Sequence, residues 1–210
     1  MPETLTTYPV KLSIDYPDRK LNRLTTFFRI FTAVPILIII GLLTSAQASG
    51  GGNEDGGWSY SVLAGLGLPL VLMILFRQKY PKWWFDWNVA LTKFSARVCA
   101  YLGLLTDVYP STDEEQSVHI DIPYPDVKNE LNRWLPLVKW FLAIPHYIVL
   151  FFLYIAAIAC LVIVWFAILF TGRFPRGLFD FVVGVSRWSL RVDAYALLLV
   201  TDRYPPFTLD

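Results

Sequence analysis

The sequence predicts an all-α integral membrane protein made of two tandem repeats in parallel orientation, and three observations support this fold class. The stretch from Trp134 to Phe170 holds one lysine, one histidine and otherwise almost only aliphatic and aromatic side chains. A helix that is apolar on every side belongs in a bilayer. Of the 210 residues, 55% are hydrophobic and 17% charged, and the mean hydropathy is +0.48, which is unusually apolar for a soluble domain. The third observation is internal repetition.

The repeat is first visible in residues 8–18 and 118–126, where alternating apolar residues stop at the same Tyr-Pro-Asp. Such self-similarity over the whole length predicts two copies of one unit, residues 1–113 and 114–210. Further positions match in one order: Leu21-Asn22-Arg23 with Leu131-Asn132-Arg133, Arg29 with Lys139, Pro35 with Pro145, Asp86 with Asp180, Lys93 with Arg187, Arg97 with Arg191, and Thr106-Asp107 with Thr201-Asp202.

Each unit begins with a short extended segment. Residues 10–14 and 118–122 alternate apolar and polar side chains, which is the period of a strand. The two strands are expected to pair with each other or with the sheet edge of another protein.

A transmembrane helical hairpin is expected next in each unit. The first hairpin covers residues 24–76. Its first helix, from Leu24 to Thr44, crosses the membrane, a glycine-rich loop follows, and a second helix, from Trp58 to Phe76, returns. The second hairpin, residues 131–170, lacks such a loop, and the repeat places a tight turn near residues 154–157. Pro35 and Pro145 should kink their helices because proline removes a backbone donor.

Basic residues flank both hairpins, and the intervening loop of the first holds only acids. By the positive-inside rule, both termini face the cytoplasm, which gives four transmembrane helices in the cytoplasmic membrane.

Each unit closes with an amphipathic helix, residues 82–105 and 177–200. Trp84, Trp87 and other apolar residues form one stripe of the first helix, while Asp86, Lys93 and Arg97 lie opposite. The second copy repeats this pattern with Asp180, Arg187 and Arg191. The pattern is typical of a helix that lies in the membrane interface, with its cations among anionic head groups. The alternative is that both helices cross, giving six spans. It would bury Lys93 and Arg97 at mid-membrane at roughly 2.5–3.5 kcal/mol each.

Several signatures resemble a prokaryotic membrane-protein family known only as a domain of unknown function. They are Asp-Tyr-Pro-Asp, Phe-Leu-Ala-Ile-Pro-His-Tyr (Phe141 to Tyr147), the segment from Thr171 to Phe181, and Thr-Asp-Arg-Tyr-Pro-Pro-Phe at the end. The resemblance covers both copies and implies a multi-pass membrane protein without an established activity. In the first copy, Ile36 replaces His146 and Gln78 replaces Gly172.

The composition does not favour an enzyme, a cofactor or a metal site. Two histidines are few for a nucleophile–base pair, and Gly50 to Gly52 lacks the pattern of a phosphate-binding loop. A net charge of +1 also argues against a nucleic-acid partner.

The sequence therefore favours an accessory, scaffold or lipid-contacting protein of the cytoplasmic membrane, whose partners are the bilayer, its anionic head groups, and a protein partner or a second copy. The alternative is a small-solute transporter or channel built on the duplication. Candidate head-group or ligand contacts are Arg29, Lys93, Arg97, Lys139, His146, Arg187 and Arg191, and Asp86 and Asp180 are candidate structural acids. An intramembrane histidine or lysine is a functional candidate by default.

Overall fold

A two-stranded antiparallel sheet joins the two halves of the chain. The computed structural model describes residues 8–17, 21–48, 70–112, 114, 116–127, 129 and 131–210. Strand β1 (Lys11–Ile14) pairs with β2 (Val118–Asp121), and Leu12 lies opposite Ile120. Both predicted strands are confirmed, and they pair with each other. Leu12 and Ile120 are buried because alternate side chains of a strand point to the same face.

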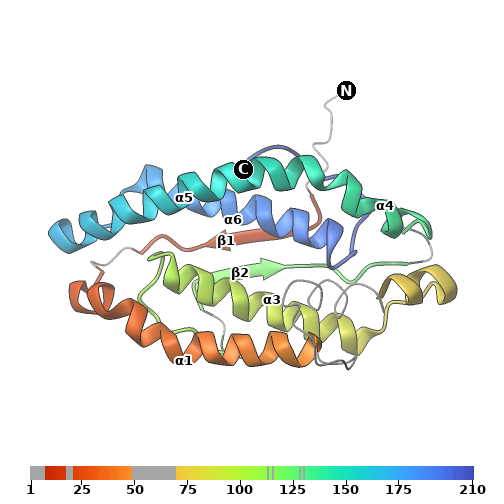
Figure 1. Ribbon diagram of the computed structural model, residues 1–210, viewed down its shortest axis with the longest axis horizontal. Helices are drawn as coiled ribbons and strands as arrows, with labels where there is room; N and C mark the ends of the chain where they lie inside the picture. Colours follow the sequence, from red (N-terminus) through yellow and green to blue (C-terminus); the bar gives the residue numbers. More distant parts are fainter. Residues whose placement is uncertain are drawn as a thin grey trace, which may run out of the picture.

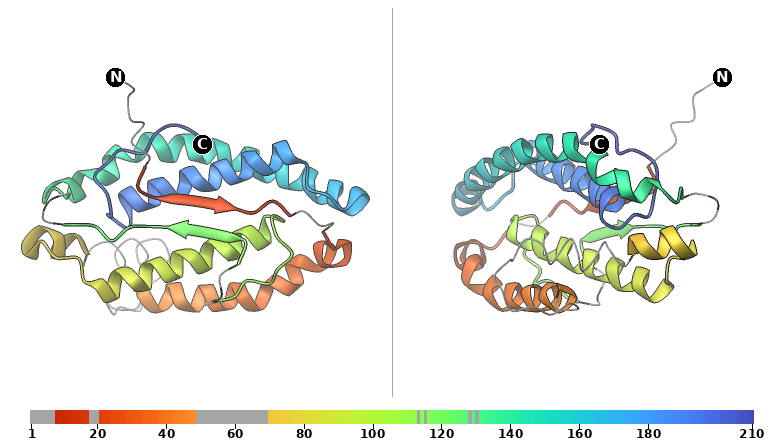
Figure 2. Two further views of the ribbon diagram at one scale, coloured as in Figure 1. Left: turned by 180° about the vertical axis from the view of Figure 1, so that it is seen from behind. Right: turned by 45° about the vertical axis from the view of Figure 1, so that its right-hand side comes forward.

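The helices form two further layers on one side of the sheet. Helix α6 (Arg176–Ala196) packs against β1, and α3 (Lys82–Leu102) packs against β2. Helix α5 (Ile144–Thr171) covers α6, and α1 (Arg23–Ala48) covers α3. Helices α1 and α5 touch and run in opposite directions (Figure 1). Seen from behind, the strands are in front and α1 and α5 lie farthest away (Figure 2).

The two amphipathic helices form as predicted, and each packs against a strand and against another helix. Each begins after a proline, Pro81 or Pro175, whose φ of −63° and ψ of 126° direct the chain into the first turn. Part of each apolar stripe faces protein, since Phe94, Val98, Val185 and Val192 are buried, whereas Trp87 of the α3 stripe is 44% exposed. The position of the two helices in the membrane interface stays a prediction.

The predicted hairpin turn near residues 154–157 is wrong, because α5 runs unbroken through this stretch. The chain breaks earlier, at Ala143, between α4 (Leu135–Leu142) and α5. Residues 146–170 contain no glycine or proline to end a helix. The helix stops only at Gly172, whose φ of 73° is the left-handed conformation of a helix C-terminus.

Both prolines that were expected to kink helices lie just after a bend or break. Pro145 follows the break at Ala143, and the two parts of α1, Arg23–Arg29 and Phe31–Leu42, meet at 50° shortly before Pro35. The loop of the first predicted hairpin and most of its returning helix lie outside the described residues. The described part of that helix covers residues 70–77.

Among the described residues, one helical run is long and apolar enough to cross a membrane, Leu135–Thr171. A second qualifies if the two bent parts of α1 count as one span. The fold is mostly helical, with one or two candidate membrane helices, and this is weak evidence of membrane association.

Candidate functional site

The outer faces of α1, α4 and α5 form an apolar surface. Only one narrow stripe of α5 is buried, and its members recur at intervals of four or seven residues, as on one side of a helix. The other faces carry large exposed side chains, with Phe152 at 64% and Phe170 at 78% exposure. The exposed apolar residues of the three helices include Phe27, Phe28, Phe31, Leu37, Ile38, Leu42, Phe141, Ile148, Phe151, Phe152, Ile155, Ile158, Val162, Ile163, Phe166 and Phe170.

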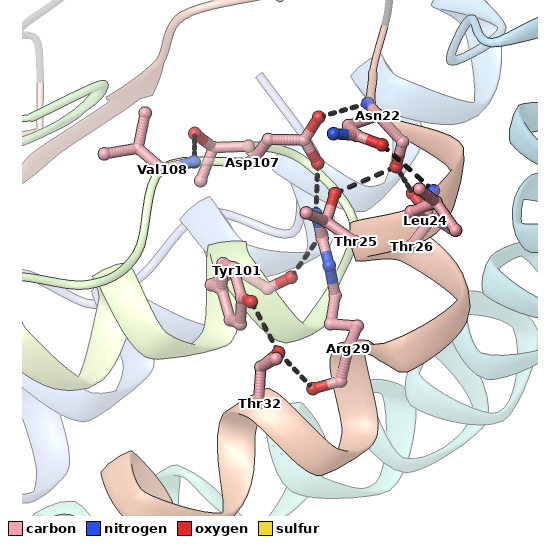
Figure 3. A network of polar contacts seen from close by, with 10 residues as sticks. Asn22, Leu24, Thr25, Thr26, Arg29, Thr32, Tyr101, Asp107 and Val108 are labelled. Atoms are coloured by element: carbon pink, nitrogen blue, oxygen red, sulfur yellow. Dashed lines mark hydrogen bonds and ion pairs between the residues drawn. The ribbon is translucent and has the colours of Figure 1, made fainter.

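Arg29 of α1 lies in a buried polar network beneath this surface (Figure 3). Its guanidinium forms an ion pair with Asp107 and donates a hydrogen bond of 2.6 Å to the carbonyl oxygen of Tyr101. The guanidinium carbon lies 4.5 Å from the centre of the Tyr101 ring. The second carboxylate oxygen of Asp107 accepts a 2.6 Å bond from the backbone N–H of Asn22. The network therefore ties the start of α1 to the segment that follows α3.

Lys139 of α4 has the same kinds of partners. Its Nζ lies 2.7 Å from a carboxylate oxygen of Asp202 and donates a 2.7 Å bond to the carbonyl oxygen of Thr201. The ring of Tyr195 is 5.0 Å away, and the backbone N–H of Asn132 donates to Asp202 at 2.6 Å. Lys139 is fully buried. Both intramembrane cations predicted from the sequence are thus neutralised by internal carboxylates.

His146 is held by aromatic rings that come from α6 and from the C-terminal segment. The indole N–H of Trp188 donates a 3.1 Å bond to His146 Nδ1, and the ring of Phe207 stacks on the imidazole at 4.0 Å between centres. The His146 side chain is fully buried, and its Nε2 has no partner among the described residues. Arg29 and Lys139 lie in separate networks, and the start of α1 and helix α4, which hold them, lie at opposite ends of the molecule (Figure 1). Among the described residues, no hydrogen bond or ion pair joins either cation to His146.

Three of the predicted head-group cations donate hydrogen bonds to backbone carbonyls. Arg97 donates to the carbonyl oxygen of Ser111 at 3.0 Å, and Arg187 donates to those of Leu12 at 3.1 Å and Leu209 at 3.2 Å. Arg191 bonds residues at the C-terminus, and burial followed by the charge of Arg187 lowers its pKa.

The other predicted site residues of α3 and α6 lie closer to the surface. Lys93 is half-buried, and Asp86 and Asp180 are exposed. Contact with head groups stays a prediction for the cations of both helices. A structural role for Asp86 and Asp180 also stays a prediction.

Sequence reasoning missed the partners that matter most. Asp107 and Asp202 were noted as repeat matches but not as acceptors for Arg29 and Lys139. The Thr-Asp motif that both share, located after α3 and after α6, was the signal that could have identified these two partners. Asp193 was also missed: it is half-buried on α6, and burial raises its pKa from 3.8 to about 6. In the described part of the chain, no group of three or more His, Cys, Asp or Glu residues is arranged to hold a metal ion.

Comparison with known proteins gives one family match. The model described as "Domain of unknown function (DUF4389)" matches residues 134–208, which span α4, α5, α6 and the C-terminal segment. The second half of the chain is therefore similar to that family over this range. No curated protein and no solved structure matches this chain.

Proposed function

We propose that the protein is a membrane accessory, scaffold or lipid-contacting protein, anchored by the apolar surface of α1, α4 and α5. The exposure of this surface carries the proposal. Moving seven of its large side chains from water into lipid is worth on the order of 10 kcal/mol. That is as large as the net stability of a typical domain. Soluble monomers rarely expose contiguous apolar patches of this kind, so lipid is the fitting surrounding.

We also propose that the two halves are copies of one unit related by a twofold axis. The matched residues Arg29 and Lys139 have equivalent partners, and Leu12 lies opposite its sequence match Ile120. Leu104 and Leu199, which precede the two Thr-Asp motifs at the same spacing, both adopt positive φ, 63° and 54°. Leucine rarely takes this conformation, so its recurrence supports a shared ancestry of the halves.

The opposite directions of α1 and α5 constrain how they enter lipid. If both crossed the bilayer, the two halves would have opposite orientations. We propose instead that both lie along the membrane, with the strands and inner helices on its cytoplasmic side. This arrangement keeps both termini on one side.

Spin labels along α5 test the proposal. Single cysteines replace Ile148, Ile155, Val162 or Phe166 in a protein whose Cys99 and Cys160 are changed to serine, with Asp180→Cys on α6 as the water-exposed control. In liposomes, collisions with oxygen and with a water-soluble nickel complex should place the α5 labels at similar shallow depths. A maximum of depth near the middle of α5 would overturn the flat arrangement in favour of a span. Free access of the nickel complex to all four positions would refute lipid contact.

The transporter alternative is less well supported. It requires Arg29, Lys139 and His146 to face a shared hydrated path, whereas each has its own separate partners among the described residues.

A further inference from the structure

A cavity of about 240 Å³ lies between α3 and α6, apart from the networks described above. Helix α3 lines it with Thr92, Ser95 and Cys99, and α6 lines it with residues at the matching positions. Leu12 and Ile120 of the paired strands form an apolar wall. The α6 residues are Ser186, Ser189 and Asp193. The cavity thus lies where the two proposed halves meet.

Asp193 is the one acidic residue of this lining. No hydrogen bond or ion pair joins its carboxylate to any other residue in the described part of the chain. Its charge acts on three titratable groups, Cys99 of α3 and Tyr147 and Tyr154 of α5, and none of them is a cation. The strand residues beside it are apolar. A half-buried carboxylate without a cation is costly, and a positive ligand would offset that cost.

The other polar groups of the cavity are hydroxyls. Tyr154 bonds Ser189 across 2.5 Å, while Thr92 and Ser186 donate to carbonyl oxygens one turn earlier in their helices. Their remaining lone pairs can accept hydrogen bonds. One carboxylate with hydroxyls is a poor site for Ca²⁺ or Mg²⁺, which prefer several carboxylate or carbonyl oxygens. An ammonium group has three donors that suit a carboxylate and two hydroxyls.

The volume limits the size of the ligand. At about 30 Å³ per water, the cavity holds on the order of eight water molecules, which is below the size of drug-binding pockets. It can hold an ammonium group with a short alkyl chain against Leu12 and Ile120, but not a lipid tail.

We propose that this cavity binds a primary alkylammonium group, with Asp193 as its counter-ion and Ser189 among the hydroxyl acceptors. The ammonium belongs to a free amine or to the head group of an aminophospholipid. The site does not depend on the proposed membrane arrangement, since Asp193 and most of its walls come from α3, α6 and the strands, and Tyr154 is the one lining residue of α5. Ligand binding requires the ionised carboxylate, so affinity falls as the pH decreases below the pKa of Asp193, which is about 6.

Cys99 gives a direct readout because it is exposed and lines the cavity. In a Cys160→Ser protein, Cys99 is the single thiol, and a thiol-specific methanethiosulfonate reagent labels it in detergent micelles. Ethylamine at about ten times its Kd should slow the labelling about tenfold, and ethanol of the same size should not. The ratio of rates with and without ethylamine should approach one near pH 5.

Two variants and a lipid arm complete the test. Asp193→Asn should abolish the protection by ethylamine, whereas Asp180→Asn, an exposed carboxylate on the same helix, should leave it unchanged. Nanodiscs of phosphatidylglycerol with and without phosphatidylethanolamine identify the source: protection by the added lipid assigns the site to a head group, and protection by ethylamine alone assigns it to a free amine. The proposal would be overturned if neither ethylamine nor phosphatidylethanolamine slowed the labelling of Cys99. Equal protection by ethanol, or protection by ethylamine that persists in Asp193→Asn, would also overturn it.

Discussion

The buried cations of the two halves differ in how completely their donors are satisfied. Lys139 uses a single nitrogen to reach both Asp202 and the Thr201 carbonyl, whereas Arg29 spreads its two terminal nitrogens over Asp107 and Tyr101. The Nε of Arg29 is buried without a partner in the described residues. The comparison shows that a cation, a carboxylate and a carbonyl are sufficient for the contact, while the type of cation can change.

The largest effect is expected from removing a carboxylate of these pairs. Asp202→Asn leaves the fully buried Lys139 charge without its counter-ion, so the free energy of unfolding should fall by about 3–5 kcal/mol. Thermal or denaturant unfolding in detergent micelles measures this change. Asp180→Asn, at an exposed position of the same half, should change stability by at most about 0.5 kcal/mol. Equal effects of the two variants would show that the Lys139 pair does not hold α4 in place.

The next-largest effect on the free energy of unfolding is expected at Asp193, which stands where the first half has Cys99. Because burial raises the pKa of Asp193 from 3.8 to about 6, the folded state binds the proton more tightly than the unfolded state. Its contribution to stability therefore decreases as the pH rises from about 4 to about 6, and stays constant above that range.

At 1.36 kcal/mol per pKa unit, the total decrease is at most about 3 kcal/mol. Asp193→Asn should be more stable than the wild type at pH 7 and should lack this pH dependence. Unfolding measured across this pH range is the check. An identical pH profile in the variant would mean that other groups cause the dependence.

A smaller effect is expected at Gly184, whose sequence match in the first half is Ala90. A Cβ at Gly184 would lie 2.8 Å from the Leu209 carbonyl oxygen and 2.9 Å from its Cβ. Gly184→Ala should displace the C-terminal segment and cost about 1–3 kcal/mol, with faster proteolysis of that segment. Gly177→Ala is the matched control on the same helix, because nothing lies within 4 Å of its added Cβ. Destabilisation by both variants alike would exclude this packing explanation.

The smallest effect concerns the helix ends at Gln78 and Gly172. Both backbones have positive φ, 45° at Gln78 and 73° at Gly172, and both N–H groups bond the carbonyl four residues earlier. Glutamine pays a steric cost in this conformation that glycine avoids. Gln78→Gly should therefore raise stability by about 1 kcal/mol. A lower unfolding temperature of Gln78→Gly would show that the Gln78 side chain contributes more than the strain costs.

The same comparison between halves explains one failed prediction. The turn near residues 154–157 was inferred by transferring a hairpin from the first half, although the local sequence has no residue that ends a helix there. Direct periodicity, in contrast, correctly predicted both strands and both amphipathic helices. Local residue types were thus a better guide than analogy between the halves.

The sequence by itself determined the elements and the apolar character of the outer helices, because helix and strand periods, prolines and caps act over a few residues. Only the tertiary structure decided which groups meet. Asp107 lies 78 residues from Arg29, and Trp188 lies 42 residues from His146. It also decided that protein covers part of the apolar stripe of α3 and of α6, since an apolar stripe is compatible with lipid or protein as its neighbour. Such choices depend on the packing of distant segments, which no local pattern encodes.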